Sequence, residues 1–184
     1  MRLGQRLVLA LLPCLVGGVA LAQDLAFTAI PPLTDRDSTA AASLPAAEVK
    51  QVLDQVERTS FDTPDSWENE LRLRRLPIAG GDGLVVRGTA MLCGGTGNCE
   101  TWLFRRVKGA WVNMFEGEAP VISSFGFGRQ VNHDLPDFIA TAPLSAAKSN
   151  YMVYVFDGAF YRADGCYEVE VPAAKGSVKK VTCK

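Results

Sequence analysis

The chain has 184 residues, five cysteines and a nearly balanced charge, with 19 basic and 20 acidic side chains and a net charge of −1. This length corresponds to about one domain. Because both signs of charge are interspersed, the composition gives no electrostatic case for a nucleic-acid partner or for an anionic membrane surface. Function must therefore be sought in particular residues and loops.

The first 22 residues have the pattern of a secretory signal peptide. Basic residues precede an apolar run from Leu7 to Val19, and an A-x-A cleavage motif follows at Ala20 to Ala22. The apolar run is short for a membrane span, and no other segment is long enough for one. Cys14 raises the alternative of a lipoprotein, which Pro13 and the good downstream cleavage motif disfavour. The sequence predicts export to the bacterial periplasm, with secretion beyond it as the second destination.

Residues 23–43 are rich in Pro, Thr and Ala and have no period, which predicts an extended or flexible arm. Residues 44–57 predict an amphipathic helix, with Ser43 as its cap and Pro45 in its first turn. Its apolar face recurs at helical spacing: Val49, Val52, Leu53 and Val56. The opposite face is expected to lie in water: Glu48, Lys50, Gln51 and Asp54. The stretch from Phe61 to Asp65 is expected to end the helical region.

From Trp67 onward the apolar residues alternate with polar ones, which indicates eight or nine short strands. The segments between them are interpreted as turns or loops: 80–83, 108–109, 128–136, 143–149 and 157–158, the last of these as a two-residue hairpin turn. No helices separate the strands, so a parallel sheet is disfavoured. Residues 44–184 are thus expected to form a single, mainly β domain. We expect an antiparallel meander, as a sandwich, a barrel or a partial propeller, with the helix packed on one side. Aromatic residues at period two are expected in its core: Trp102, Phe104, Trp111 and Phe115.

The four cysteines downstream of the leader predict two disulfides. Three connectivities are open, and the local pairs Cys93–Cys99 and Cys166–Cys183 are favoured because each pair brackets a plausible hairpin. A metal site is disfavoured because the spacing is wrong and only one histidine is available. No cofactor motif is present, so neither a metal nor a cofactor is predicted.

His133 is the single histidine, and it lies in a polar loop. One interpretation makes it a general base with Asp134 or Asp137 in a hydrolase. The favoured one is a solvated loop histidine, since there is no G-x-S-x-G motif and the cysteines are expected to be oxidised. A calcium site on Asn132, Asp134 and Asp137 would lack the glycine and distal glutamate of known calcium loops. The sequence therefore predicts no enzyme and no metal, and keeps these four residues as candidate binding residues.

The segment between Cys93 and Cys99 reads GGTGN, and its glycines suit a disulfide-closed turn. It is no phosphate-binding loop, because no Lys-Ser/Thr pair follows and the chain continues into a strand. Thr96 and Asn98 are its polar side chains and are candidate binding residues. A rigid, exposed loop of this kind can present a binding surface.

Three motifs resemble a pattern found in small exported bacterial β-rich proteins of uncharacterised function. They are the G-x-G-N-C hairpin with the following W-x-F (Cys93 to Phe104), the Leu135 to Phe138 segment, and Y-V-F-D-G-x-x-Y (Tyr154 to Tyr161). The chain is more loosely similar to periplasmic lysozyme inhibitors and to immunity proteins built like them. That likeness implies a β-rich, disulfide-clipped body with exposed binding loops, although the acidic calcium loops of some of those proteins are missing here.

The leading functional hypothesis is therefore a non-enzymatic periplasmic binding protein that inhibits, or gives immunity to, a cell-wall hydrolase. It would insert a rigid loop into the cleft of a protein partner, with Gly94–Asn98 and Gly128–Asp137 as the candidate loops. The alternatives are an envelope-associated structural domain and, less favoured, a hydrolase that uses His133.

Overall fold

The structure is a computed structural model that describes residues 25–34, 36–56, 71–78, 81–88, 93–116, 119–170 and 177–183. The expected signal peptide (1–22), the end of the expected helix at Glu57 and the sequence signals from Phe61 to Trp67 lie outside the described residues.

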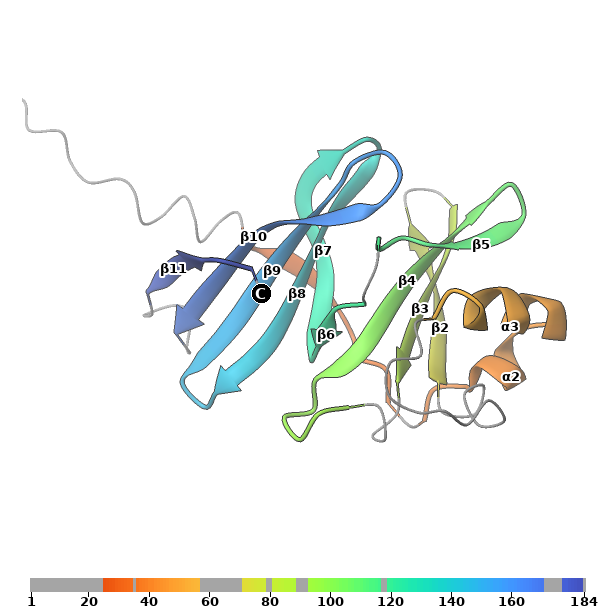
Figure 1. The fold of residues 1–184 in the computed structure, drawn as a ribbon, viewed down its shortest axis with the longest axis horizontal. Helices are drawn as coiled ribbons and strands as arrows, with labels where there is room; N and C mark the ends of the chain where they lie inside the picture. Colours follow the sequence, from red (N-terminus) through yellow and green to blue (C-terminus); the bar gives the residue numbers. More distant parts are fainter. Residues whose placement is uncertain are drawn as a thin grey trace, which may run out of the picture.

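Two antiparallel sheets make up most of the described chain, which confirms the mainly β prediction, and neither closes into a barrel (Figure 1). The larger sheet has the strand order β1-β7-β8-β9-β10-β11. The smaller has the order β2-β3-β4-β5, with β6 paired to β4. The described residues form eleven strands, more than the eight or nine expected: β1 Phe27–Ile30, β2 Leu71–Ile78, β3 Gly81–Gly88, β4 Cys99–Val107, β5 Ala110–Asn113, β6 Val121–Ile122, β7 Ser124–Asn132, β8 Leu135–Ser145, β9 Lys148–Phe156, β10 Tyr161–Glu170 and β11 Val178–Val181. The helical part consists of α2 (Ala40–Ser43) and α3 (Ala46–Leu53).

The two sheets share a core to which both contribute every second side chain. Val85 and Leu103 come from the smaller sheet, and Phe125 and Phe138 from the larger one. The ring of Phe115 meets that of Phe138 edge-on, with 5.2 Å between the centroids. Buried aromatic pairs of this geometry add to the stability that burial gives. Phe115 therefore ties the end of the β4–β5 hairpin to the larger sheet.

A second core lies on the other face of the smaller sheet, beneath α3, so the molecule has three layers. Trp102, Phe104 and Trp111 are buried there against Val49 and Val52 of the helix. The expectation that the period-two aromatics are core residues is confirmed. They serve two cores, however, because Phe115 lies on the opposite side of the smaller sheet.

The helix differs from the prediction in its start, its end and its polar face. It begins after Pro45 with no side-chain cap, so Ser43 is not its cap, and Asp54 follows its last residue. A residue that precedes proline avoids the helical conformation, which explains why Leu44 breaks α2 from α3. Lys50 and Asp54 are solvated as expected and form an exposed ion pair.

Glu48 and Gln51 do not simply face water, and Gln55 joins them at the edge strand β5. Gln55 donates to the carbonyl of Trp111 at 2.7 Å and accepts from the Asn113 amide at 2.8 Å, while the Trp111 amide donates to Gln51 at 3.3 Å. An unprotected strand edge invites pairing with another chain. The helix thus covers the edge of β5 with side-chain amides.

The prediction of a polar loop at 128–136 is wrong, because β7 and β8 form a long hairpin there. Only His133 and Asp134 make the turn, both with positive φ (49° and 71°). Polar residues on the exposed part of a strand give no apolar alternation, so the sequence pattern resembles that of a loop. The same reason applies at 143–149, where β8 runs to Ser145 and β9 begins at Lys148.

One of the predicted hairpin turns is confirmed, and two differ in their bounds. The confirmed turn is at 108–109, where φ is 50° and 88°, as type I′ hairpins require. The turn at 157–158 belongs to a four-residue loop, because Phe156 pairs with Tyr161. Asp157 accepts the amides of Ala159 and Phe160, and this Asx-type turn extends the loop. At the expected turn 80–83, residues 81–83 already belong to β3.

Part of the expected N-terminal arm is a strand at the edge of the larger sheet, where β1 pairs with β7. A Cβ on Gly126 would lie 2.1 Å from the Thr28 carbonyl oxygen, so only glycine allows the two strands to approach. After β1 the chain crosses to the smaller sheet, where Thr39 forms an isolated bridge with Arg72 of β2. Arg74 holds this crossing by donating to the Pro31 carbonyl and pairing with Asp37 at 2.7 Å.

Candidate functional site

Both predicted disulfides are present, Cys93–Cys99 and Cys166–Cys183. The second joins β10 to the end of β11, whose pairing places Cys166 opposite Val181. The first closes the loop that leads into β4. Such bonds are typical of an oxidising compartment, so they are compatible with an extracellular or periplasmic protein.

Between its cysteines, the 93–99 loop is a compact turn with an exposed tip. The Gly94 amide donates to the Asn98 carbonyl and the Gly97 amide to the Gly94 carbonyl, both at 2.8 Å. Gly97 has φ +75°, which favours glycine. Residues 94–97 are exposed, including the candidate Thr96, whereas Asn98 is half-buried. Of the two candidate residues in this loop, Thr96 is therefore the one that is exposed to a partner.

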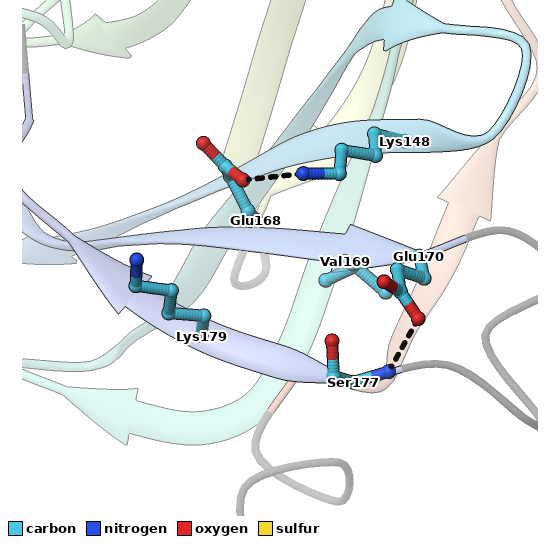
Figure 2. Close-up of a pocket in the computed structure, with 6 residues that line it drawn as sticks. All are labelled: Lys148, Glu168, Val169, Glu170, Ser177 and Lys179. Atoms are coloured by element: carbon cyan, nitrogen blue, oxygen red, sulfur yellow. Dashed lines mark hydrogen bonds and ion pairs between the residues drawn. The ribbon is translucent and has the colours of Figure 1, made fainter.

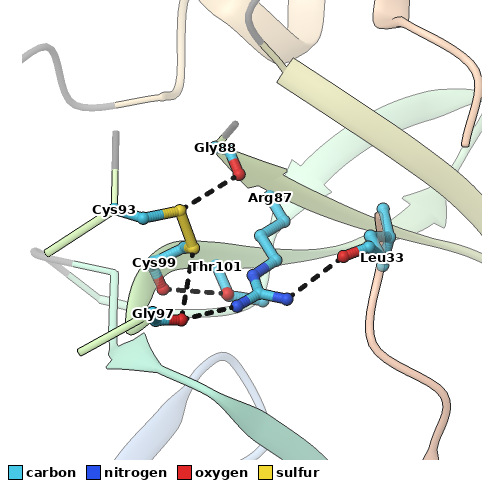
Figure 3. The surroundings of a disulfide bond; sticks show 7 residues. All are labelled: Leu33, Arg87, Gly88, Cys93, Gly97, Cys99 and Thr101. Atoms are coloured by element: carbon cyan, nitrogen blue, oxygen red, sulfur yellow. Dashed lines mark hydrogen bonds between the residues drawn. A yellow bond between two sulfur atoms is a disulfide. The ribbon is translucent and has the colours of Figure 1, made fainter. Parts of the chain in front are cut away.

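Arg87 of β3 supports this loop from behind (Figure 3). Its guanidinium donates to the Gly97 carbonyl at 3.0 Å and to the Leu33 carbonyl at 3.2 Å. One side chain thus links the disulfide loop to the crossing between the sheets. Burial lowers the pKa of the Arg87 guanidinium, but an arginine stays charged because its ordinary pKa is so high.

A cavity of about 430 Å³ lies between the disulfide loop and the ends of β2 and β3. Arg87 and Arg72 line it from neighbouring strands, where they are register partners. Leu33, Thr34 and the glycines of the loop complete the wall. Sequence reasoning missed Arg87. The available signal was its position two residues after the core residue Val85, which places it on the face that looks toward the other sheet.

The other candidate residues gather around the β7–β8 turn. The imidazole of His133 lies beside Gly158, since a Cβ placed there would be 3.6 Å from Nδ1. Asn132 donates to the Asp137 carboxylate at 2.8 Å, and Asp137 is only 5% exposed. Burial, helped by the nearby charge of Asp164, raises the pKa of Asp137, although the Asn132 hydrogen bond opposes this.

The catalytic and metal alternatives gain no support from this geometry. In the described part of the chain, no hydrogen bond or ion pair joins His133 to Asp134 or Asp137. Nor do the described residues contain a group of three or more His, Cys, Asp or Glu side chains that could hold a metal. Asn132 uses its amide N–H₂ toward Asp137, so these two residues already satisfy each other.

The structure separates the six candidate residues into two regions. Cys99 pairs with Ile122 at the start of β6 and β7, whereas Asn132 lies at the far end of β7. Nine residues of strand span about 30 Å. Thr96 and Asn98 therefore lie at one end of the molecule, and the His133 turn lies at the other (Figure 1).

A smaller hollow of about 110 Å³ lies over β9, β10 and β11 (Figure 2). Its charges are largely satisfied within the protein. Lys148 pairs with Glu168 at 3.3 Å, and Glu170 accepts the Ser177 amide at 3.3 Å. It is a weaker candidate than the cavity beside Arg87.

Among the described residues, no helix has the length and apolar character needed to cross a bilayer. Comparisons with protein-family models, with curated proteins and with solved structures gave no match, so the functional argument rests on the residues and their geometry.

Proposed function

We propose that this protein is a non-enzymatic periplasmic binding protein that inhibits, or gives immunity to, a cell-wall hydrolase. The observation that supports the proposal best is the exposed tip of the 93–99 loop on a firmly held base. The signal-peptide pattern of residues 1–22 and the two disulfides support the periplasmic location.

The loop suits insertion into a narrow cleft for two reasons. First, the disulfide, the two internal hydrogen bonds and the Arg87 contact restrict its motion, so little conformational entropy is lost on binding. Second, its tip carries glycines and one exposed polar side chain, Thr96, which keeps it thin. Hydrolase clefts are concave, and a thin rigid projection complements them.

The decisive experiment uses purified protein from residue 23 onward and a panel of purified peptidoglycan hydrolases. Clearing of a peptidoglycan suspension reports hydrolase activity. We expect stoichiometric inhibition of at least one hydrolase in the panel, with Thr96→Ala weakening it several-fold.

Gly95→Trp is the sharper variant, because nothing lies within 4 Å of a Cβ at Gly95 and its φ is not in the left-handed range. The bulky ring should block insertion and weaken inhibition at least tenfold while leaving the melting temperature unchanged. Ala110→Trp, at the far and exposed end of the β4–β5 hairpin, is the matched control and should inhibit like the wild type. Inhibition that survives Gly95→Trp would contradict the loop assignment.

The same assay separates the alternatives. An envelope-associated structural domain would sediment with peptidoglycan without inhibiting any hydrolase. A hydrolase would clear the suspension by itself and lose that activity in His133→Ala. Either result would replace the proposal.

A further inference from the structure

Within the described residues, no carboxylate pairs with Arg87, in contrast to three arginines that do form ion pairs. Arg74 pairs with Asp37, Arg106 with Glu48, and Arg162 with both Asp157 and Glu116. Within the described residues, Arg87 donates only to two neutral backbone carbonyls. A partly buried cation without a counter-charge is unfavourable, and an anion relieves that cost.

The guanidinium also has donors to spare. An arginine offers five N–H groups, and the two carbonyls accept two of them. The Nε–H is buried without an acceptor in the described part of the chain. The remaining N–H groups belong to a side chain that is partly exposed and lines the 430 Å³ cavity. Hydrogen bonds from a charged donor to an oxyanion are about twice as strong as neutral ones.

The rest of the cavity wall is also compatible with a negatively charged ligand. None of the described lining residues is acidic, so none of them repels a negatively charged ligand. Gly94, Gly95 and Gly97 have no side chains to keep a ligand away from the loop backbone. The volume is in the range of roughly 300–1,000 Å³ that small-molecule sites occupy.

We infer that this cavity is a binding site for a small oxyanion ligand, one that carries a carboxylate or a phosphate group, with Arg87 as the principal anion-binding residue. The inference goes beyond the proposed function, because it needs no protein partner. It stands or falls on ligand binding to the isolated protein, whereas the inhibitor proposal is tested on hydrolases.

The test is an NMR titration of the ¹⁵N-labelled protein with inorganic phosphate and, separately, with acetate, at ionic strength held constant with sodium chloride. We expect saturable shifts of the Arg87 Nε–H signal and of the amides of Gly94, Gly95 and Gly97. Saturation by phosphate alone identifies a phosphorylated ligand class, and saturation by acetate alone identifies a carboxylate class. Shifts that grow linearly with either anion, or no shifts at these groups, would overturn the inference.

Variants show whether Arg87 is responsible. Arg87→Gln should lower the affinity for the anion that saturates the wild type at least tenfold. Lys108→Asn, which removes one positive charge at the far end of β4 in a turn that accepts asparagine, should bind within twofold of the wild type. If Arg87→Gln does not fold, the affinity of Arg87→Lys for the same anion tests the role of Arg87 instead. A single ammonium cannot reproduce the planar fork, so its affinity should fall several-fold, and an unchanged affinity would refute the role of Arg87.

Discussion

The indole N–H of Trp111 donates to Glu48 at 2.6 Å, and it thereby joins the edge strand of the smaller sheet to α3. The same carboxylate oxygen accepts from Arg106 at 2.6 Å, and the Arg106 guanidinium lies 4.6 Å from the Trp111 ring centroid. Two donors, one from each strand of the β4–β5 hairpin, therefore depend on one carboxylate on a helix of only two turns.

We predict that Glu48→Gln lowers the melting temperature at pH 7. The hydrogen bond from Trp111, followed by that from Arg106, lowers the pKa of Glu48 from its ordinary value of 4.5. A lowered carboxylate pKa contributes stability above the unfolded-state value, and this contribution is lost as the pH falls through the folded-state value. The difference in melting temperature between the wild type and Glu48→Gln should therefore become smaller below about pH 4.5. Thermal unfolding followed by circular dichroism between pH 2.5 and 7 measures it.

Asp54→Asn is the matched control, because it removes a carboxylate from the same helical segment but only from an exposed ion pair with Lys50. Exposed pairs of this kind contribute little. A loss of stability as large as that of Glu48→Gln would show that helix charge, and not the Trp111 contact, is what matters.

Asp137→Asn should act in the opposite direction and raise the melting temperature at pH 7. Burial raises the pKa of Asp137 above its ordinary 3.8, so ionisation costs stability as the pH rises through the folded-state value. The asparagine keeps an oxygen to accept from Asn132 but has no charge to bury. The advantage should vanish near pH 3, where wild-type Asp137 is protonated. A lower melting temperature at pH 7 would contradict the assigned pKa direction, and Asp164→Asn should give a smaller gain of the same sign.

The β7–β8 turn offers a stabilising substitution. Asp134 has φ +71°, a conformation that costs a non-glycine residue about 1–2 kcal/mol. Asp134→Gly should therefore raise the free energy of unfolding by about 0.5–1 kcal/mol. Urea denaturation measures it, and a decrease would mean that the aspartate side chain makes a contact worth more than the backbone strain.

The two disulfides should contribute unequally to stability. Loop-closure entropy predicts a loss of about 2 kcal/mol for Cys93→Ser/Cys99→Ser and about 3 kcal/mol for Cys166→Ser/Cys183→Ser. Urea denaturation of the two double variants gives both values. An intact mass of the exported protein should also show loss of residues 1–22 and of four hydrogens. A reversed order of the two stability losses would contradict the entropic account.

The sequence was sufficient for the fold class because strand alternation and cysteine spacing are local signals. Turns at Lys108-Gly109 and pairs such as Cys166–Cys183 involve neighbouring segments. The long β7–β8 hairpin was missed because its tip lies beyond the core, where Arg129 and Gln130 give no apolar period. The pairing of β1 with β7 was missed because nothing local reports on so distant a partner.

The candidate site was only half predictable for a related reason. The disulfide loop is a contiguous motif, so its exposed tip could be anticipated. The cavity beside it is built from Leu33, Arg72 and Arg87, which are far apart in the chain and meet only through sheet pairing and the crossing segment. The position of Arg87 two residues after Val85 indicates which face of the strand it lies on, but it does not mark the arginine as a site residue. Arg87 becomes a candidate anion-binding residue only because the fold places none of the described carboxylates beside it.

The pairing of β1 with β7 also bears on when the chain would fold during the export that we propose. A chain that crosses a membrane from its N-terminus delivers Phe27 to Ile30 first, but their partners Phe125 to Gly128 come roughly a hundred residues later, and such distant contacts form slowly. The larger sheet therefore cannot be completed until most of the chain has arrived. Until β7 arrives, β1 has no strand to pair with, and we expect a chain exported in this way to be most prone to aggregation in that interval.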